Sequence, residues 1–489
     1  MRDDELRRIL VDANPWWRAA ATGTDPTAWT RDHRLLRDRA THDLGYRSDV
    51  LADIESGPLT DRLVVLTGPR RIGKSVVLLD AVAALCGREE VDPRQIIHVP
   101  CDGMRDRDLR RTLTLARELT RTVDRSTAQC RRVWLLDEIG GVAGWTAILK
   151  AARDGTGFGD DTVVATGSRW AANEDIEGNL MAGRAGNTTG RRRRLVLPMT
   201  FRDILVATRP ELGTPPKVHP SQLQDLPTAT ALERLQFDVD AYDLAWQAYL
   251  TCGGFPRAVA EYHRAGAVSD AYFADLAAWL RRDVDADAPQ ESLPRLLDAL
   301  AQRATSPLSL TRAAEHLGYG SRDTFRLRLT RLTSTCAALW CPRRENDQVV
   351  PGSQSKFYLT DPLLAWLPER LRGLPQPDMT SLTEMALGVS LARAIEREQE
   401  GRWMSEDTIG FARTASGNEI DLAPVSVPTP AGSSQTVPLE SKWVDQGWKG
   451  EARTIDGKYQ RGVLATKSIL DVNGRVWAVP APLLSLLLL

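Results

Sequence analysis

The chain has 489 residues, of which 63 are Lys or Arg and 64 are Asp or Glu, so its formal net charge is −1. This length predicts about three domains, each able to bury a core of its own. The balanced charge excludes a globally basic nucleic-acid coat, so any contact with DNA has to come from local patches.

The six cysteines and the chain ends indicate where the protein works. No two cysteines form a C-x-x-C pair, so zinc is not expected and reduced thiols in a cytoplasm fit best. The N-terminal MRDDELRRILVD has no apolar signal core, and the leucine-rich run over 483–489 is too short to span a bilayer. We therefore expect a soluble cytoplasmic protein with no membrane partner.

Residues 1–55 are expected to form helical segments that lead into a nucleotide-binding core over 56–207. Residues 68–75, GPRRIGKS, satisfy every fixed position of the phosphate-binding loop G-x-x-x-x-G-K-[ST]. The apolar run 63–66 before it predicts a buried parallel strand, and residues 76–82 after it predict a helix. This order, strand then glycine loop then helix, is the one that the motif requires.

The chemistry of this loop explains its residue types. Its glycines let backbone N–H groups surround phosphate oxygens, Lys74 reaches the outer phosphates, and the Ser75 hydroxyl ligates Mg²⁺. The predicted nucleotide-binding residues of the loop are Gly68, Pro69, Arg70, Arg71, Ile72, Gly73, Lys74, Ser75 and Val76. The alternative is a loop of the same form that no longer binds nucleotide.

Two further strands are predicted to bring polar side chains to this site. The apolar run 133–136 ends in Asp137, suited to hold Mg²⁺, and Glu138, suited to polarise the attacking water. The alternative is that both acids only cap the segment that follows. A third buried strand over 161–168 ends at Ser168, which either contacts the water or γ-phosphate or belongs to an ordinary turn.

Together, the strings GPRRIGKS, LLDEIGGVAGW, ATGS and LVLPMTFRDIL resemble a large family of prokaryotic AAA-like ATPases, whose members read GPRRxGKT, DEIxxxxGW, TGS and LxPLSFxEF. The resemblance implies an α/β core of the additional-strand P-loop type that uses ATP and Mg²⁺. It also implies that Asp137 is the metal carboxylate, Glu138 the catalytic base and Ser168 a sensor. Among Arg184 and residues 191–194, one arginine would stabilise transition-state charge, or the group is a solvated or DNA-contacting basic turn.

Two helical units are expected after the core. Residues 208–290 follow a proline-rich connector and correspond to the helical lid of the resembling family; its GGFP turn at 253–256 is interpreted as structural. Residues 291–372 predict a winged helix, with a third helix over 322–332 and a wing from 337–340 and 356–359. Arg322, Arg326 and Arg328 are expected outside and are the predicted DNA contacts. The alternative is a winged helix that contacts only protein.

Residues 373–489 carry a second candidate site. Asp421 is followed nineteen residues later by Glu440-Ser441-Lys442, and strand alternation places Glu440 and Lys442 on one face. This D…E-x-K spacing resembles the PD-(D/E)XK nuclease fold, which the resembling ATPases carry at their C-terminus. In that chemistry Asp421 and Glu440 hold a divalent ion, and Lys442 positions its water.

Two features speak against cleavage by this site. The acidic position expected after Gly388 holds Ala392, while Glu384 and Glu396 are out of register, and Pro438 interrupts a strand that should be central. The alternative is a domain that binds nucleic acid or a partner without cutting it.

The sequence thus predicts an ATP-dependent, DNA-associated enzyme that forms a homo-oligomer or acts alone and that processes DNA or defends against foreign DNA. The alternative from another class is a signalling or regulatory switch whose C-terminal domains only recognise partners.

Overall fold

A computed structural model describes residues 1–56, 59–121, 131–155, 158–168, 192–286, 289, 291–302, 305–405 and 408–489. The chain divides into two compact units, residues 1–197 and 198–489. The first unit ends ten residues before the expected end of the core at 207, because helix α8 (Phe201–Thr208) packs within the second unit. Phe201 makes an edge contact there with Trp246, at 5.0 Å between ring centroids.

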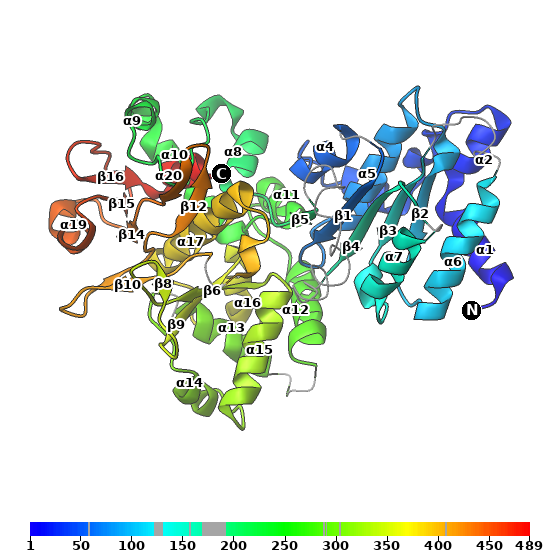
Figure 1. The fold of residues 1–489 in the computed structure, drawn as a ribbon. Helices are drawn as coiled ribbons and strands as arrows, with labels where there is room; N and C mark the ends of the chain where they lie inside the picture. Colours follow the sequence, from blue (N-terminus) through cyan, green and yellow to red (C-terminus); the bar gives the residue numbers. More distant parts are fainter. Residues whose placement is uncertain are drawn as a thin grey trace. The chain divides into compact units, whose positions relative to one another are not determined.

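The N-terminal unit is built on a five-stranded sheet of order β2-β3-β4-β1-β5 (Figure 1). Every pairing in it is parallel. Its strands are β1 (Arg62–Thr67), β2 (Ile96–Pro100), β3 (Val133–Asp137), β4 (Thr162–Gly167) and β5 (Arg193–Leu195). Strand β4 lies between β1 and β3, which is the additional strand that the resemblance implies. The predicted strands over 63–66, 133–136 and 161–168 are therefore confirmed.

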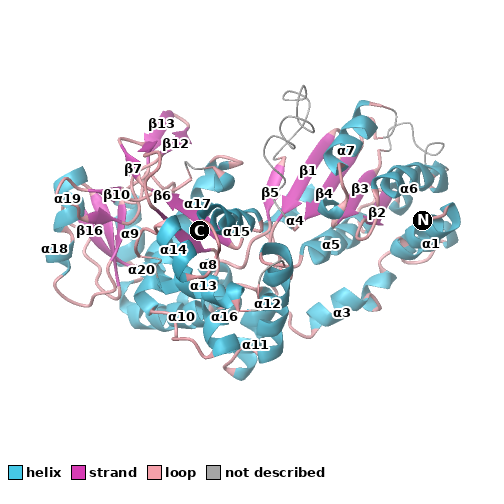
Figure 2. Cartoon of the chain, turned by 90° about the horizontal axis from the view of Figure 1, so that it is seen from below, coloured by secondary structure: helices cyan, strands magenta, loops and turns pink. Residues whose placement is uncertain are grey.

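Helices cover both faces of this sheet, as Figure 2 shows. They are α1 (Asp3–Ala13), α2 (Pro15–Thr22), α3 (Arg34–Ala40), α4 (Asp49–Ser56), α5 (Lys74–Cys86), α6 (Asp106–Leu119) and α7 (Trp145–Asp154), with 3₁₀ turns η1 (Ala28–Arg31), η2 (Pro93–Gln95) and η4 (Ile139–Gly141). Leu6 of α1, Leu109 of α6 and Ile148 of α7 share one core with Val65 and Leu136 of the strands. Helix α5 packs against β2 and β3 and buries Leu78, Leu79 and Val82.

The C-terminal unit is mostly helical and carries several small sheets. Its helices are α8, α9 (Leu226–Glu233), α10 (Val239–Cys252), α11 (Pro256–Ala265), α12 (Asp270–Val284), α13 (Ser292–Gln302), α14 (Leu310–His316), α15 (Arg322–Ser334), α16 (Pro362–Arg372), α17 (Met379–Glu398), α18 (Trp448–Glu451), α19 (Arg453–Tyr459) and α20 (Ala481–Leu488), with 3₁₀ turns η6 (Pro210–Leu212), η7 (Gln236–Asp238) and η8 (Arg402–Met404).

Its strands pair locally. They are β6 (Ala338–Pro342), β7 (Arg344–Glu345), β8 (Gln348–Val349), β9 (Ser355–Leu359), β10 (Ala412–Arg413), β11 (Glu419–Ile420), β12 (Ser426–Thr429), β13 (Gly432–Gln435), β14 (Leu439–Ser441), β15 (Gly462–Thr466) and β16 (Val476–Pro480). Strands β6 and β9 form an antiparallel ribbon, and β14, β15 and β16 form a parallel sheet. Pro438 immediately precedes β14, a position that proline tolerates, and its carbonyl accepts a bond from Val463 N–H.

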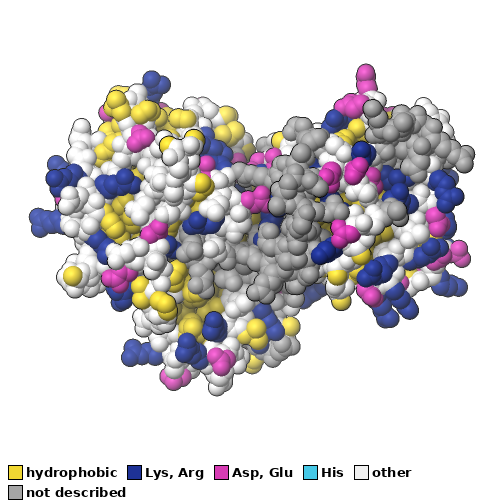
Figure 3. All heavy atoms as spheres, viewed as in Figure 1, with side chains coloured by type: hydrophobic (Ala, Val, Ile, Leu, Met, Phe, Trp, Pro, Cys, Tyr) yellow, Lys and Arg dark blue, Asp and Glu magenta, His cyan; other side chains and the backbone are white. Residues whose placement is uncertain are grey.

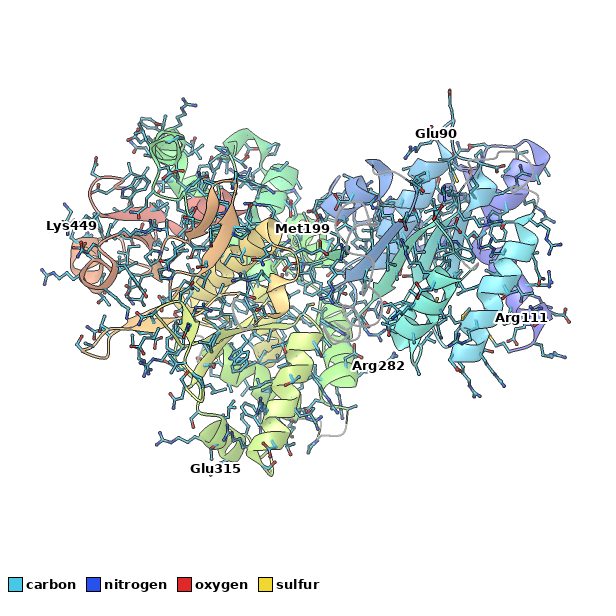
Figure 4. All side chains as sticks on the ribbon, viewed as in Figure 1. Glu90, Arg111, Met199, Arg282, Glu315 and Lys449 are labelled. Atoms are coloured by element: carbon cyan, nitrogen blue, oxygen red, sulfur yellow. The ribbon has the colours of Figure 1, made fainter. Side chains whose placement is uncertain are left out.

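The GGFP turn joins three segments of this unit. Gly254 N–H donates to Oδ2 of buried Asp361 at 2.8 Å, and the Gly254 carbonyl accepts from Met199 N–H at 2.7 Å (Met199 is labelled in Figure 4). A Cβ on Gly254 would lie 2.1 Å from the Met199 carbonyl oxygen, so only glycine fits. Asp361 also caps α16 by accepting a bond from Leu363 N–H at 2.9 Å. These contacts support the structural interpretation of the turn.

The leucine-rich end of the chain forms α20, and its side chains are buried in the C-terminal unit. Within the part of the chain that the structure describes, no helix is both long enough and apolar enough to cross a bilayer.

Candidate functional site

The phosphate-binding loop connects β1 to α5 at the carboxyl edge of the parallel sheet. Gly68 lies so close to the end of β5 that a Cβ there would be 2.0 Å from the Val196 carbonyl oxygen. Gly73 has a φ of 98°, which favours glycine, and it directly precedes α5. The N-terminus of α5, where Lys74 and Ser75 lie, therefore faces the loop, and the first N–H groups of a helix have no partner within the helix itself.

Lys74 is buried in the loop and is bound by neutral oxygens. Its Nζ donates to the carbonyl oxygens of Gly68 at 3.0 Å and Pro69 at 2.9 Å. Its side chain is only 3% exposed, and its Nζ lies 3.8 Å from Oε1 of Glu138. The ammonium is thus held over the loop with one carboxylate nearby, and the carbonyls do not neutralise its charge.

The two acids after β3 are arranged by a threonine of β4. Thr166 Oγ1 donates to Oδ1 of Asp137 at 2.8 Å and accepts from Glu138 N–H at 2.8 Å. Glu138 has a φ of 52°, an uncommon conformation for a residue other than glycine. The network fixes the Asp137 carboxylate and the backbone of Glu138 at the strand ends, beside the loop.

Burial shifts the pKa values of two titratable groups near Asp137 in the direction that favours their neutral forms. Burial lowers the pKa of His98 on β2, although the charge of Asp137 opposes this shift. Burial also raises the pKa of the Cys101 thiol well above its usual range. Burial therefore favours the uncharged imidazole of His98 and the uncharged thiol of Cys101 beside Asp137.

Other predicted residues of this unit have different positions. Ser168 is buried directly after β4, but the hydroxyl that contacts Asp137 belongs to Thr166, so the sensor role of Ser168 stays a prediction. Arg184 and Arg191 lie outside the described residues. Arg193 is buried on β5, and Arg194 lies 2.9 Å from Asp49 and 2.5 Å from Asp53. These two are therefore not a solvated turn.

The predicted residues of the C-terminal site also converge. Glu440 is buried on β14, and Nζ of Lys442 lies 3.3 Å from its Oε1. Oδ2 of Asp421 accepts a bond from Ser441 N–H at 2.9 Å, which ties Asp421 to the same strand. Burial raises the pKa of Glu440 to about 7; Lys442 opposes this rise and Asp421 adds to it.

Sequence reasoning missed the centre of this cluster. Nζ of Lys356, on β9, donates to Oε1 of Glu384 at 2.8 Å and to Oδ1 of Asp421 at 3.0 Å. The sequence places Glu384 out of register, but this residue of α17 reaches the site. Ala392, at the expected acidic position, is buried in the apolar core. The sequence did contain a signal for both residues. Glu384 is the single charged residue in 379–392, and Lys356 lies near the start of an otherwise uncharged strand.

The third helix of the predicted winged helix is α15, and its arginines divide into two groups. Arg322 and Arg326 are exposed. The expectation that Arg328 is exposed is wrong: it is buried, and its Nε lies 2.8 Å from Oδ1 of buried Asp285. On the face of the C-terminal unit drawn in Figure 3, Lys and Arg side chains occur singly and not as one large patch.

Two family models match parts of the chain. Residues 60–205 match the family described as AAA domain, and residues 243–372 match a domain of unknown function (DUF8612). No curated protein matches the chain. Among solved structures, the Walker-type ATPase PABY2304 of Pyrococcus abyssi is 14% identical with a TM-score of 0.36, covering 63% of this chain and 91% of its own. The match to the AAA domain, with the parallel sheet and glycine loop, supports a P-loop ATPase core in this chain.

Proposed function

We propose that the N-terminal unit binds ATP with Mg²⁺ and hydrolyses it. The observation that carries this proposal is the position of Lys74, whose Nζ is held by loop carbonyls 3.8 Å from the Glu138 carboxylate. Backbone N–H groups, one ammonium and a pair of acids at adjacent strand ends are the components that phosphoryl transfer to water requires.

Each residue has a distinct role in this proposal. Lys74 exchanges its carbonyl partners for outer phosphate oxygens, and Glu138 orients and deprotonates the attacking water. Ser75 and Asp137 are the residues that would hold Mg²⁺, which supplies positive charge to the phosphates. Thr166 keeps the Asp137 carboxylate in place through its 2.8 Å bond.

The test replaces Glu138 by Gln, which keeps the shape of the side chain and removes the base. We expect the rate of ATP hydrolysis to fall by about 10²–10⁴-fold, while ATP binding persists. The matched control is Glu90→Gln, an exposed glutamate of the same unit (Figure 4). An unchanged rate in Glu138→Gln would contradict the assignment.

We further propose that residues 291–372 form a winged helix that contacts DNA through Arg322 and Arg326. Support comes from the order α13, α14, α15 and the β6–β9 ribbon, and from the exposure of both arginines. Phosphate contacts make binding depend on salt. Replacing both by Gln is expected to weaken duplex binding and to reduce the salt slope by about 2, whereas Arg295→Gln on α13 serves as control. Unchanged binding would favour a unit that contacts only protein.

A second candidate function is metal-dependent DNA cleavage by Asp421, Glu440 and Lys442. In this function, ATP binding or hydrolysis by the N-terminal unit would position the unit that carries these residues. The convergence of these side chains on β14 favours it. Cleavage of linear or circular DNA in Mn²⁺, lost in Lys442→Ala while ATP hydrolysis survives, would support this function. Failure on every substrate would favour a switch whose C-terminal unit only recognises partners.

A further inference from the structure

A buried lysine lies where the carboxylates of the C-terminal unit converge. Nζ of Lys356 is 2.8 Å from Oε1 of Glu384, 3.0 Å from Oδ1 of Asp421 and 2.7 Å from Oε1 of Glu419. Its side chain is 0% exposed. An ammonium has three N–H donors. Lys356 donates hydrogen bonds to Glu384 and Asp421, and Glu419 forms an ion pair with it.

The position of this ammonium is fixed by its surroundings. Lys356 pairs with Cys341 in the β6–β9 ribbon, so its backbone is held by a strand. Tyr358, on the same face of β9, donates from its hydroxyl to the same Glu384 oxygen at 2.7 Å. The ring of Phe411 lies 5.5 Å from the Lys356 Nζ and adds a cation–π contact. The ribbon, α17 and β11 thus build one site around a positive charge.

The surrounding carboxylates favour the charged form of Lys356. Burial alone would lower its pKa, but the carboxylates of Asp421, Glu384 and Glu419 raise that pKa well above the usual value. Several carboxylates buried together need a cation to offset the repulsion between them. Lys356 provides that cation from within the chain.

A divalent metal ion does not fit the cluster in this arrangement. Mg²⁺ and Ca²⁺ need oxygen ligands at about 2.0–2.6 Å, and the ammonium already stands between the oxygens that would supply them. Among the residues that the structure describes, no group of three or more His, Cys, Asp or Glu side chains is placed to hold a metal ion. Lys442 is a separate lysine, 36% exposed at its side chain and paired with Glu440.

We propose that the Lys356 ammonium is the resident cation of the cluster formed by Glu384, Glu419 and Asp421, in place of a divalent metal. The cluster binds Mg²⁺ or Mn²⁺ only when this side chain is removed. The claim concerns the C-terminal unit alone, so it is independent of ATP hydrolysis by the N-terminal unit. It argues against the second candidate function, because metal-dependent cleavage would need Asp421 to hold a divalent ion.

The first test titrates the full-length, nucleotide-free protein with Mn²⁺ and measures free Mn²⁺ by electron paramagnetic resonance. Lys356→Met is expected to bind Mn²⁺ more tightly than wild type by on the order of tenfold or more, and Lys356→Met/Asp421→Asn is expected to lose this gain. The control is Lys449→Met, an exposed lysine of α18 that leaves Lys356 in place, and it is expected to bind Mn²⁺ like wild type. Weak binding at the phosphate-binding loop is common to all four proteins.

Two results would overturn the proposal: tight Mn²⁺ binding by wild type that Asp421→Asn abolishes, or no gain in a folded Lys356→Met protein. A cooperative urea-unfolding transition of the C-terminal unit establishes that the variant is folded. If Lys356→Met does not fold, the proposal is tested on the wild-type protein. Its lysines are acetylated with acetic anhydride, and the modified lysines are identified by peptide mass spectrometry. We expect Lys442 to be modified and Lys356 to stay protected with or without millimolar Mn²⁺; labelling of Lys356 caused by Mn²⁺ would show that the metal displaces it.

Discussion

Each unit of this protein buries a lysine beside acidic residues, but the two lysines have different partners. In the N-terminal unit, Nζ of Lys74 is bound by two carbonyl oxygens, with the Glu138 carboxylate 3.8 Å away. In the C-terminal unit, Nζ of Lys356 lies within 3.0 Å of three carboxylates. Carbonyl oxygens accept hydrogen bonds from an ammonium but do not neutralise its charge, whereas carboxylates accept hydrogen bonds and neutralise the charge.

This difference indicates different roles for the same chemical group. In the proposed ATP site, Lys74 exchanges its carbonyl partners for the phosphate oxygens of an anionic ligand. The compensated ammonium of Lys356 holds three chain segments together and offers nothing to an anion. Both residues are buried lysines, so residue type and burial alone do not distinguish the role of Lys74 from that of Lys356.

The largest expected effect is on stability, in Lys356→Met. Removing one member of a buried ion cluster leaves carboxylates without a counter-charge, which typically costs about 3–5 kcal/mol. Urea unfolding of the C-terminal unit measures this cost, with the exposed Lys449→Met on α18 (labelled in Figure 4) as control. If Lys356→Met lost no more free energy of unfolding than Lys449→Met, the assigned role of Lys356 would be wrong.

The reverse pattern is expected for Lys74→Met. Losing the ammonium should reduce ATP hydrolysis by about 10²–10³-fold or more. The unfolding midpoint should change less than in Lys356→Met, because two partners of Lys74 are neutral carbonyls and the Glu138 carboxylate is 3.8 Å away. Lys150→Met, on α7 of the same unit, is the matched control. If hydrolysis persisted in Lys74→Met, the loop would not be the site of phosphate binding.

Much of the first site was predictable from sequence, because the phosphate-binding loop and the acids after β3 are contiguous motifs on a parallel sheet. Thr166 was within the ATGS string, but its bond to Asp137 depends on β4 lying beside β3. Lys356 and Glu384 are 28 residues apart on a strand and a helix, so only tertiary packing brings them to Asp421. Arg328 was placed outside because its partner, Asp285, belongs to another helix end.

A smaller effect on the first site is expected from Thr166→Val, which removes the hydroxyl between Asp137 and the Glu138 N–H. Loss of this bond costs about 1–2 kcal/mol, equivalent to about tenfold in rate. Steady-state ATP hydrolysis measures it, and Thr114→Val on the exposed side of α6 is the control. A rate equal to wild type would show that the bond does not position the acids.

The smallest expected effect is a change of pH dependence in Glu440→Gln. Burial raises the folded-state pKa of Glu440 to about 7, from a usual value of 4.5. The protonated form is therefore favoured by folding, so this contribution to stability is complete below about pH 4.5 and is lost as pH rises through about 7. Thermal unfolding between these limits should show wild type losing stability relative to Glu440→Gln. Parallel curves would contradict the assigned pKa.

The central claim is that the N-terminal unit holds ATP at its glycine loop and hydrolyses it. The most direct measurement incubates the purified full-length protein with labelled ATP, in Mg²⁺ or in EDTA, and follows retained nucleotide and released phosphate together. We predict stoichiometric retention and phosphate release that requires Mg²⁺. A folded protein that neither retains ATP nor releases phosphate in Mg²⁺ would contradict the account.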